Sequence, residues 1–359
     1  MKSKGVLVLR SSNVKDGALI DADNVYVDPD VATSEKVKVG DIVMVVRNGS
    51  KALIGKHAEV KQPMADTVVG AFMAGIRSPC PSFANALLNT SEFDKEIAKN
   101  MGATINQLTG YMFKQMVFFM PGKEEQEKIG SLFSTLENTI TLHQRKLEAL
   151  KKLKRTLLQK MFPKKGHLKP ELRFFGFTND WEQRKFGDLF TEYAEKGFKQ
   201  YPALSIVQGA GTIERDKSNR NLSYSTNNLG NYKIVYKDDF ILHLRSFEGG
   251  LERASSTGLV SPAYHVFHSE EVNSSFFYCV FRSSNFINRL LKPCVYGIRD
   301  GKSINVSELK NVYLNIPAIS EQKKIGDFFD SVDSLITLHQ RKLEIYKKLK
   351  KGLLQKMFI

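Results

Sequence analysis

A 42-residue segment occurs twice in this 359-residue chain, and the duplication decides how the rest of the sequence is divided. Residues 121–162 read PGKEEQEKIGSLFSTLENTITLHQRKLEALKKLKRTLLQKMF, and residues 317–358, which lie 196 positions later, read PAISEQKKIGDFFDSVDSLITLHQRKLEIYKKLKKGLLQKMF. The copies are identical at 26 of 42 positions. A repeat this close indicates two equivalent structural units in tandem.

Each copy is predicted to form one long helix. Neither copy contains a proline after its first residue, and apolar side chains recur at the spacing of a heptad stripe. A helix of this length would measure about 57 Å at about 1.5 Å per residue, which is the dimension of a spacer. Because both copies carry the same stripe, we expect the two helices to pack on each other.

The direction of that packing follows from the segment between the copies. Its roughly 150 residues have the size of one domain, and the ends of a domain often lie close together, which predicts an antiparallel pair. Both stripes are interrupted first by His143 or His339 and then by Lys154 or Lys350. We expect the histidines to meet near a pseudo-two-fold axis as polar packing residues, and the lysines to extend out of the seam toward solvent.

The segments before the helices are also related, although weakly. Residues 38–48 (KVGDIVMVVRN) align with residues 236–246 (YKDDFILHLRS), so that an acidic turn at Asp41 or Asp239 precedes an apolar strand. Closer to the helices, Ile105 and Asn106 are matched with Ile304 and Asn305. The sequence therefore predicts an α+β chain of two mixed, strand-rich domains and two long helices packed as an antiparallel coiled coil. The predicted divisions are domain one at 1–120, helix one at 121–163, domain two at 164–316 and helix two at 317–359.

Domain two has an opening that domain one lacks. Residues 170–177 (PELRFFGF) and 181–188 (WEQRKFGD) precede the strand expected at 201–207, whereas domain one begins almost directly with a strand at 5–9. We therefore expect domain one to be truncated at its N-terminus, so that it is either unstable or completed by a separately encoded fragment. Such a fragment would lie beside the end of helix two, near residues 353–357.

Charge favours a polyanionic partner. Lysine and arginine outnumber aspartate and glutamate 53 to 38, a formal net charge of +15, which indicates nucleic acid first. No stretch approaches the roughly 18 apolar residues of a membrane-spanning helix. Cys80, Cys279 and Cys294 are far apart and form no Cys-x-x-Cys pair, which argues against a disulfide framework or a zinc site. We expect a cytoplasmic protein.

No catalytic motif is complete. Residues 297–303 resemble a phosphate-binding loop, but Tyr296 stands where that motif requires glycine, so we interpret the segment as a turn. His265 and His268 are expected on one side of a strand without acidic or cysteine partners at ligand spacing. Two other functions stay open: a coiled-coil scaffold whose domains bind protein, and a nuclease or helicase component, which the missing motifs disfavour.

The repeated Glu-Gln-x-Lys-Ile-Gly, Leu-His-Gln-Arg-Lys-Leu-Glu and Leu-Leu-Gln-Lys-Met-Phe sequences, with WEQRKFGDLF opening domain two, closely resemble the specificity subunits of type I restriction-modification enzymes. The resemblance implies two target recognition domains that each read half of a split DNA sequence and are held apart by the helices. It also implies a non-catalytic chain without a cofactor of its own. Its partners would be double-stranded DNA, methyltransferase subunits that modify adenine with S-adenosylmethionine, and restriction subunits that use ATP and Mg.

Candidate DNA-binding residues are polar side chains in the loops of both domains. Arginine pairs guanine through two hydrogen bonds and asparagine or glutamine pairs adenine, whereas lysine more often contacts phosphate. Arg47 and Arg245 rank first, because each follows the equivalent strand of its domain. The recurrence of arginine at this position could equally be structural. The candidates are Arg10, Ser12, Asn13, Arg47, Asn48, Lys51 and Lys56 in domain one, and Gln208, Arg215, Lys217, Arg220, Arg245, Ser246, Arg253, Arg299 and Lys302 in domain two.

The helices carry matching polar faces. By the resemblance, these faces would dock the methyltransferase helices, since two identical partners need two equivalent surfaces. A charged face that simply contacts water is the alternative. The candidate docking residues are Gln144, Arg145, Lys146, Lys151 and Lys152, with Gln340, Arg341, Lys342, Lys347 and Lys348.

Overall fold

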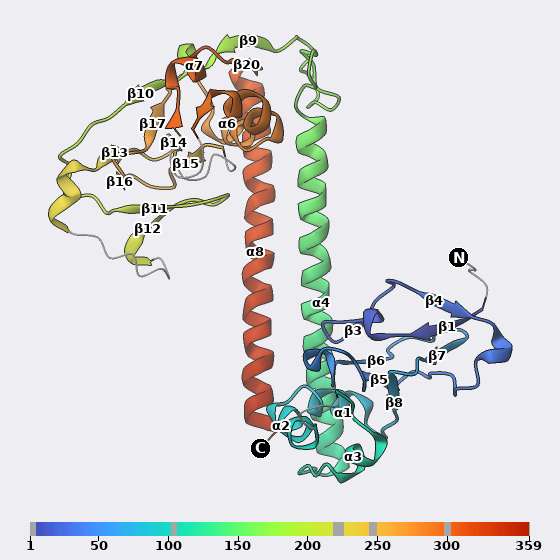
Figure 1. Cartoon of the computed structure of the whole chain (residues 1–359). Helices are drawn as coiled ribbons and strands as arrows, with labels where there is room; N and C mark the ends of the chain where they lie inside the picture. Colours follow the sequence, from blue (N-terminus) through green and yellow to red (C-terminus); the bar gives the residue numbers. More distant parts are fainter. Residues whose placement is uncertain (1–4, 102–105, 218–225, 244–249, 298–302, 359) are drawn as a thin grey trace. The chain divides into compact units, whose positions relative to one another are not determined.

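The computed structural model describes residues 5–101, 106–217, 226–243, 250–297 and 303–358 (Figure 1). The chain divides into two compact units. Unit 1 comprises residues 1–146 and 339–359, and unit 2 comprises residues 147–338. Each unit therefore contains one strand-rich domain together with part of both long helices, so the division runs through the helices rather than at their ends.

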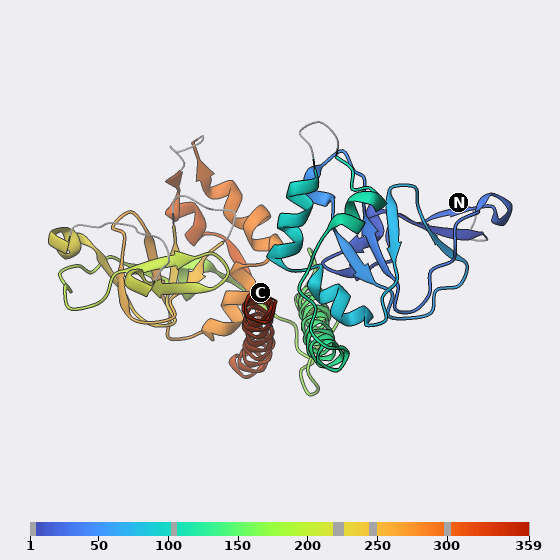
Figure 2. The ribbon, with the colours of Figure 1, turned by 90° about the horizontal axis from the view of Figure 1, so that it is seen from below.

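The two long helices form where the repeat predicts them. Helix α4 spans Lys123–Lys160 and helix α8 spans Ile319–Met357. Each helix has glutamate in its first turn and a lysine in its last turn, and both charges interact favourably with the helix dipole. In unit 1 the start of α4 lies beside the end of α8 (Figure 2), where the rings of Phe133 and Phe358 are 5.9 Å apart.

Unit 2 repeats this contact with the helices exchanged. The ring of Phe162, just after α4, is 6.3 Å from that of Phe329 in α8. The helices thus run antiparallel in each unit, which confirms the α+β coiled-coil prediction.

The histidines meet as predicted, but the two lysines cross the seam instead of extending away from it. In unit 1, His143 Nδ1 lies 2.8 Å from His339 Nδ1, and Lys350 Nζ lies 2.9 Å from Glu137 Oε1. In unit 2, Lys154 Nζ lies 2.5 and 2.8 Å from the two carboxylate oxygens of Asp333. The expectation of solvent-directed lysines was wrong, because each lysine crosses the seam to a carboxylate of the opposite helix.

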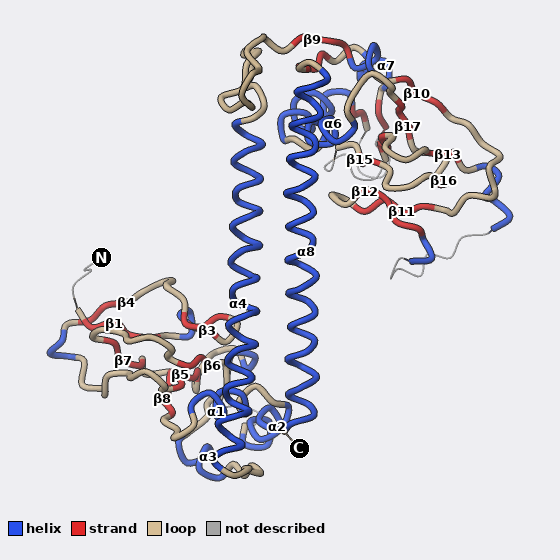
Figure 3. Tube along the Cα trace, turned by 180° about the vertical axis from the view of Figure 1, so that it is seen from behind, coloured by secondary structure: helices blue, strands red, loops and turns tan. Residues whose placement is uncertain are grey.

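Unit 1 is built from two three-stranded sheets and short helices (Figure 3). In the first sheet, β1 (Val6–Leu9) lies between antiparallel β4 (Val25–Val27) and parallel β7 (Thr67–Val69). In the second, β5 (Ile42–Val45) lies between antiparallel β6 (His57–Glu59) and β8 (Met73–Ile76) and is buried on both faces. The remaining elements are β2 (Val14–Lys15), β3 (Ala18–Leu19), α1 (Pro81–Leu87), α2 (Ser91–Asn100) and α3 (Gly110–Gln115).

Unit 2 surrounds an aromatic core with a four-stranded sheet of order β10-β17-β14-β15 and several two-stranded ribbons. The pairs are β20 with β9, β11 with β12, β13 with β16 and β18 with β19. The strands are β9 (Glu182–Lys185), β10 (Thr191–Tyr193), β11 (Leu204–Val207), β12 (Gly211–Glu214), β13 (Lys233–Val235), β14 (Phe240–Leu242), β15 (Glu252–Arg253), β16 (Gly258–Val260), β17 (His265–His268), β18 (Val295–Tyr296), β19 (Ser303–Ile304) and β20 (Tyr313–Ile316). The helices are α5 (Phe186–Leu189), α6 (Ser274–Phe281), a π-helical turn (Phe286–Leu291) and α7 (Val306–Lys310).

The acidic turns show that both domains use one backbone frame. The N–H of Asp41 donates to the carbonyl of Lys38, and the N–H of Lys38 donates back to the carboxylate of Asp41. Asp239 makes the same pair of hydrogen bonds with Tyr236. The predicted alignment of these turns is therefore confirmed.

The second predicted match is off by a few residues. Thr109 caps α3, its hydroxyl accepting from the N–H of Met112, and Asn305 caps α7 in the same way. The two caps are 196 residues apart, as are the long helices. Thr109, not Asn106, is therefore the counterpart of Asn305, and the identity of Asn106 with that cap was coincidental.

Candidate nucleic-acid interface

Two loops of unit 1 come together and carry most of its predicted DNA-binding residues. The turn of residues 10–13 follows β1, and the loop of residues 46–56 follows β5. Asn48 Nδ2 donates to Ser11 Oγ at 3.5 Å, and Lys56 Nζ donates to the Ser11 carbonyl at 3.5 Å. These contacts place Asn48 and Lys56 beside Arg10 and Ser12, while Lys51 lies exposed in the same loop.

Arg47 lies exposed at the start of this second loop. Its backbone pairs with Gln107, and its guanidinium lies 5.3 Å from the ring centre of exposed Phe72. Arg10 forms a 2.9 Å ion pair with exposed Asp23. Both guanidiniums remain at the surface, where their donor groups can turn toward a ligand.

Asn13 is a correction to the candidate set. It is only 1% exposed, and its Nδ2 donates to the Ala22 carbonyl at 2.7 Å and to Asn24 Oδ1 at 2.9 Å. Its Oδ1 accepts the N–H of Arg10 at 2.9 Å. With its amide fully used, Asn13 shapes the turn that presents Arg10 and does not itself face a ligand.

In unit 2, Gln208 lies exposed at the tip of the β11–β12 hairpin. A buried carboxylate holds this tip: Glu252 accepts the N–H of Gly209 at 2.8 Å and that of Gly211 at 3.3 Å. Glu252 also accepts from Tyr278 Oη at 2.8 Å and is ion-paired with Arg282. The sequence gives no local signal for this anchor, because its partners come from three separate segments.

Two further candidates follow the same hairpin. The guanidinium of Arg215 lies 5.3 Å from the ring centre of Tyr232, and its Nη1 donates to the Tyr232 hydroxyl at 3.3 Å. Lys217 is exposed and lies 2.9 Å from Glu214. Arg215 is thus held beside an aromatic ring, whereas Lys217 is an exposed ammonium on a flexible stem, a group suited to phosphate.

Arg253 is the second correction. Its Nη1 donates to Ser275 Oγ at 2.6 Å, and its Nη2 lies 3.3 Å from Asp330 of α8. The guanidinium also lies 5.3 Å from the ring centre of Tyr278. These contacts tie β15 to the helices of unit 2, so Arg253 supports the fold and does not face a ligand.

The other candidates of domain two lie outside the described residues. They are Arg220, Arg245, Ser246, Arg299 and Lys302, together with most of the loop at 297–303. Their DNA-binding role remains a prediction, as does the equivalence of Arg245 with Arg47.

Nine of the ten predicted docking residues are exposed. Arg145, Lys146, Lys151 and Lys152 are exposed on α4, and all five α8 residues, Gln340, Arg341, Lys342, Lys347 and Lys348, are exposed as well. Gln144 is half-buried. Exposure is compatible both with docking and with a hydrated face.

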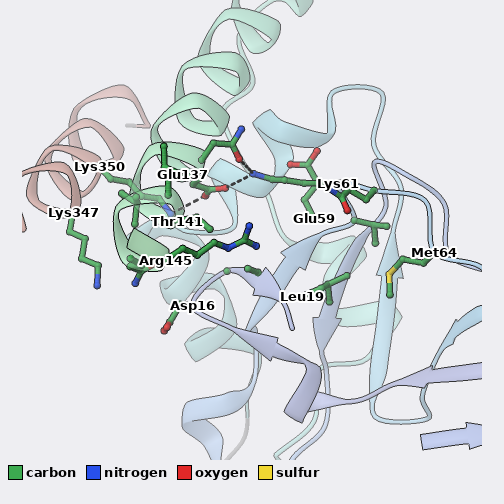
Figure 4. A pocket seen from close by; sticks show the side chains of 18 of the residues that line it. Asp16, Leu19, Glu59, Lys61, Met64, Glu137, Thr141, Arg145, Lys347 and Lys350 are labelled. Atoms are coloured by element: carbon green, nitrogen blue, oxygen red, sulfur yellow. Dashed lines mark hydrogen bonds and ion pairs between the residues drawn. The ribbon is translucent and has the colours of Figure 1, made fainter. Parts of the chain in front are cut away.

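A cavity of about 710 Å³ in unit 1 lies against α4 (Figure 4). Its wall includes Glu137, whose carboxylate oxygens lie 3.4 Å from Lys61 Nζ and 2.9 Å from Lys350 Nζ. Glu59 lies on the opposite side, where burial raises its pKa and the Ser82 hydroxyl donates to it at 3.2 Å. Glu137 is thus paired with two lysines, whereas the carboxylate of Glu59 accepts a hydrogen bond from a neutral hydroxyl.

The described residues contain no group of three or more histidine, cysteine, aspartate or glutamate side chains arranged to hold a metal ion. His265 Nδ1 lies 2.7 Å from Glu192, and His268 Nδ1 lies 2.6 Å from Asp239. The expectation that they share one side without acidic partners was wrong, since residues three apart on a strand face opposite sides and the carboxylates come from other segments. Within the described part of the chain, no helix is long and apolar enough to cross a membrane.

The chain matches known proteins over residues of both units. A family model described as "Type I restriction modification DNA specificity domain" matches residues 81–152 and 178–347. The EcoKI specificity subunit of Escherichia coli K12 is 23% identical over 358 residues, covering 90% of this chain and 75% of that protein. The MjaVIII specificity subunit of Methanocaldococcus jannaschii is 24% identical over 284 residues, which are 72% of this chain but 64% of that protein.

A solved structure shares the fold. The crystal structure of a type I restriction-modification S subunit from M. genitalium superposes with a TM-score of 0.61 at 13% identity, covering 99% of this chain and 93% of that one. At this identity the likeness establishes the architecture of strand-rich domains and long helices.

Proposed function

The chain belongs to the type I restriction-modification DNA specificity family, and from this membership we propose that it recognises a two-part DNA sequence for a type I restriction-modification enzyme. The observation that carries the proposal is the duplication of one backbone frame, in which the acidic turns of Asp41 and Asp239 make identical hydrogen bonds. Equal frames with different exposed loops are what a reader of two different half-sites requires.

Each unit presents its own set of side chains. Arg10, Asn48 and Lys56 gather in unit 1, and Gln208 and Arg215 lie on and beside one hairpin of unit 2. Arginine, asparagine and glutamine supply the paired hydrogen bonds that distinguish guanine and adenine in the major groove, and lysine neutralises phosphate. The length of the helices then sets the gap between the half-sites.

The helices are proposed to dock the partner subunits. Besides their polar faces, they expose leucines at equivalent positions, Leu142 with Leu338 and Leu153 with Leu349. Exposed apolar side chains that recur on both helices favour protein contact. The partners are two methyltransferase subunits that use S-adenosylmethionine and restriction subunits that use ATP and Mg, while this chain supplies recognition and no catalytic group.

Mapping of methylated adenine tests the proposal. The chain is co-expressed with the methyltransferase subunit of its system in a methylation-free host, and N6-methyladenine is located by single-molecule sequencing. We expect one split motif with a fixed gap. Gln208→Ala should relax one half of the motif and Asn48→Ala the other, whereas exposed Lys95→Ala on α2 should change neither. An unsplit motif, or no methylation by a folded complex, would contradict the proposal.

A further inference from the structure

A third loop of unit 1 lies beside the two loops that carry its candidate DNA-binding residues. This loop, residues 70–72, joins β7 to β8 (Figure 1). The N–H of Gly70 donates at 2.8 Å to the carbonyl of Leu9, which directly precedes the first loop. The carbonyl of Phe72 accepts the N–H of Arg47, in the second loop, at 3.2 Å. Backbone hydrogen bonds therefore join the third loop to both of the others.

The third loop is fixed at both of its ends. A Cβ at Gly70 would lie 2.9 Å from the Leu9 carbonyl oxygen and 3.7 Å from Arg10 Cγ, so this close approach requires glycine. Met73, which directly follows the loop, is buried in the same core cluster as Leu9. Phe72 thus lies between two anchored residues, and the fold of unit 1 sets its position.

Phe72 brings an aromatic ring to a surface of polar side chains. It is 55% exposed. A single exposed phenylalanine is common on protein surfaces and by itself indicates nothing. What distinguishes Phe72 is the guanidinium of Arg47, which lies 5.3 Å from the centre of its ring. The attraction between a cation and a ring orients the guanidinium without using its N–H donors.

The donors of Arg47 remain available to a ligand. Within the part of the chain that the structure describes, no ion pair joins this guanidinium to a carboxylate. Arg10, by contrast, is paired with Asp23 at 2.9 Å. Arginine with free donors is the side chain that pairs the O6 and N7 atoms of guanine in the major groove. Arg47 and Phe72 therefore present a polar group and an apolar group side by side.

The matching position of unit 2 has no ring. Ile76 in β8 and Phe267 in β17 each pair with the first residue of the equivalent strands β5 and β14. The residues four positions before them are Phe72 in unit 1 and Ala263 in unit 2, and both are exposed. The shared backbone frame therefore forms without an aromatic side chain here, which favours contact with a ligand as the role of Phe72.

We propose that Phe72 reads the 5-methyl group of a thymine in the half-site of unit 1, in the base pair next to a guanine that Arg47 pairs. This role rests on the proposed DNA recognition and adds a specificity-determining residue to it. Thymine presents its methyl group in the major groove, where an apolar side chain distinguishes it from the other bases. Successive base pairs lie about 3.4 Å apart, so two groups whose centres are 5.3 Å apart reach neighbouring pairs.

Uracil substitution tests this role, because it removes only the methyl group of thymine. The complex of the intact chain with its methyltransferase subunit is titrated against labelled duplexes of the mapped motif, in which each thymine is replaced in turn by uracil. We expect one thymine, beside a guanine, at which uracil weakens binding about fourfold, as the loss of one buried methyl predicts. The Phe72→Ala complex should bind the thymine and uracil duplexes equally at that position.

Three further variants separate this role from others. Phe72→Leu keeps an apolar side chain and should keep most of the preference for thymine. Arg47→Ala should relax the neighbouring guanine instead. Phe119→Ala removes a phenylalanine that is 90% exposed outside the three loops, and it should leave the ratio of thymine to uracil affinity unchanged at every position.

Two results would overturn the inference while the proposed function stands. One is a split motif in which no uracil beside a guanine weakens binding by the parent complex. The other is a Phe72→Ala complex that loses affinity for all duplexes with an unchanged ratio of thymine to uracil affinity, as expected if the ring only braces Arg47 or inserts between bases. Absence of any split motif with the parent chain would overturn the proposed function itself, and the role of Phe72 with it.

Discussion

The two units keep the same backbone contacts and differ in the side chains that complete them. In unit 1 the carboxylate of Asp41 accepts hydrogen bonds from Arg77 Nε at 2.8 Å and from Arg77 Nη2 at 2.9 Å. In unit 2, Asp239 Oδ1 lies 2.6 Å from His268 Nδ1, and the hydroxyl of Tyr193 donates to the other carboxylate oxygen of Asp239. The turn itself needs only a carboxylate that accepts a backbone N–H, so the outer partner was free to differ.

The contact between each domain and its helix shows the same rule more strongly. Ser82 in unit 1 donates to Glu59, whereas the equivalent Ser275 in unit 2 is bonded to Arg253 and Asp330. A negative side chain in one unit thus stands where a positive one stands in the other. What is common is the close approach of a short helix to a glycine, Gly130 or Gly326.

The aromatic clusters offer the largest test of this comparison. Phe276 touches Phe162, Trp181 and Phe277, whereas Phe83 has an aromatic contact with Phe358. Truncation to alanine leaves a cavity in either core, at a cost of about 3–5 kcal/mol in the free energy of unfolding. We expect Phe276→Ala at the upper end and Phe83→Ala below it, measured by urea unfolding with circular dichroism. An equal or greater loss for Phe83→Ala would show that the indole of Trp181 adds nothing to the free energy of unfolding.

The two glycines should respond alike. A Cβ at Gly326 would lie 2.4 Å from Asn273 Oδ1 and 2.9 Å from the backbone N of Phe276, and one at Gly130 would lie 2.7 Å from the backbone N of Phe83. Alanine at either position should cost about 1–3 kcal/mol, since backbone must shift. Gly352→Ala is the control, because no atom lies within 4 Å and helix propensity predicts a gain of about 0.5–1 kcal/mol. A neutral Gly130→Ala would break the equivalence.

The histidine pair, His143 with His339, is expected to make the stability of unit 1 depend on pH. One Nδ1–H donates to the other Nδ1, so the 2.8 Å contact has room for one proton. Burial, followed by the charges of His339, Lys342 and Lys146, lowers the pKa of His143. Its folded-state pKa lies below the unfolded value of about 6.5, so stability is present above that pH and is lost as the pH falls through it.

His143→Ala tests this reading. At pH 8 it should cost about 0.5–1.5 kcal/mol for the lost hydrogen bond, and it should flatten the decline in stability between pH 8 and pH 5. The measurement is the urea midpoint across that range, with exposed His167→Ala as the control. A variant that declines as steeply as the parent would place the pH dependence elsewhere.

Periodic features were predictable from the sequence and long-range pairings were not. The heptad stripe and the 196-residue repeat predicted α4, α8 and the meeting of His143 with His339, because each depends on local spacing. The partners of Lys154 and Lys350 depend on the register of the opposite helix, which a stripe does not specify. Their carboxylates, Asp333 and Glu137, were present in the repeat but lie off the apolar stripe.

The candidate interface was predictable only as a set of loops. Exposed arginines and amides in loops were found by residue type, but residue type cannot separate Gln208, which is presented at a hairpin tip, from Arg253, which braces the helices. The prediction for Asn13 was wrong for the same reason, because the sequence does not distinguish a buried asparagine that shapes a turn from an exposed one. Glu252 was missed because nothing in its neighbours signals that it holds the hairpin.

The smallest expected effect compares the outer partners of the acidic turns. The hydrogen bond from Arg77 is the main cause that lowers the pKa of Asp41. A carboxylate with a lowered folded-state pKa stabilises the fold above its unfolded pKa of about 3.9 and loses that contribution as the pH falls further. Arg77→Gln should therefore lower stability at pH 6, and the difference from the parent should shrink below about pH 4.

His268→Gln in unit 2 should do less, because the Tyr193 hydroxyl and the N–H of Tyr236 still donate to Asp239. In unit 1, loss of Arg77 leaves Asp41 with the N–H of Lys38. Acid unfolding followed by circular dichroism from pH 6 to pH 2 compares the two variants, with the exposed pair variant Lys95→Gln as the control. If His268→Gln moved the acid transition further than Arg77→Gln, the imidazole rather than the tyrosine would be the partner that holds the turn of unit 2.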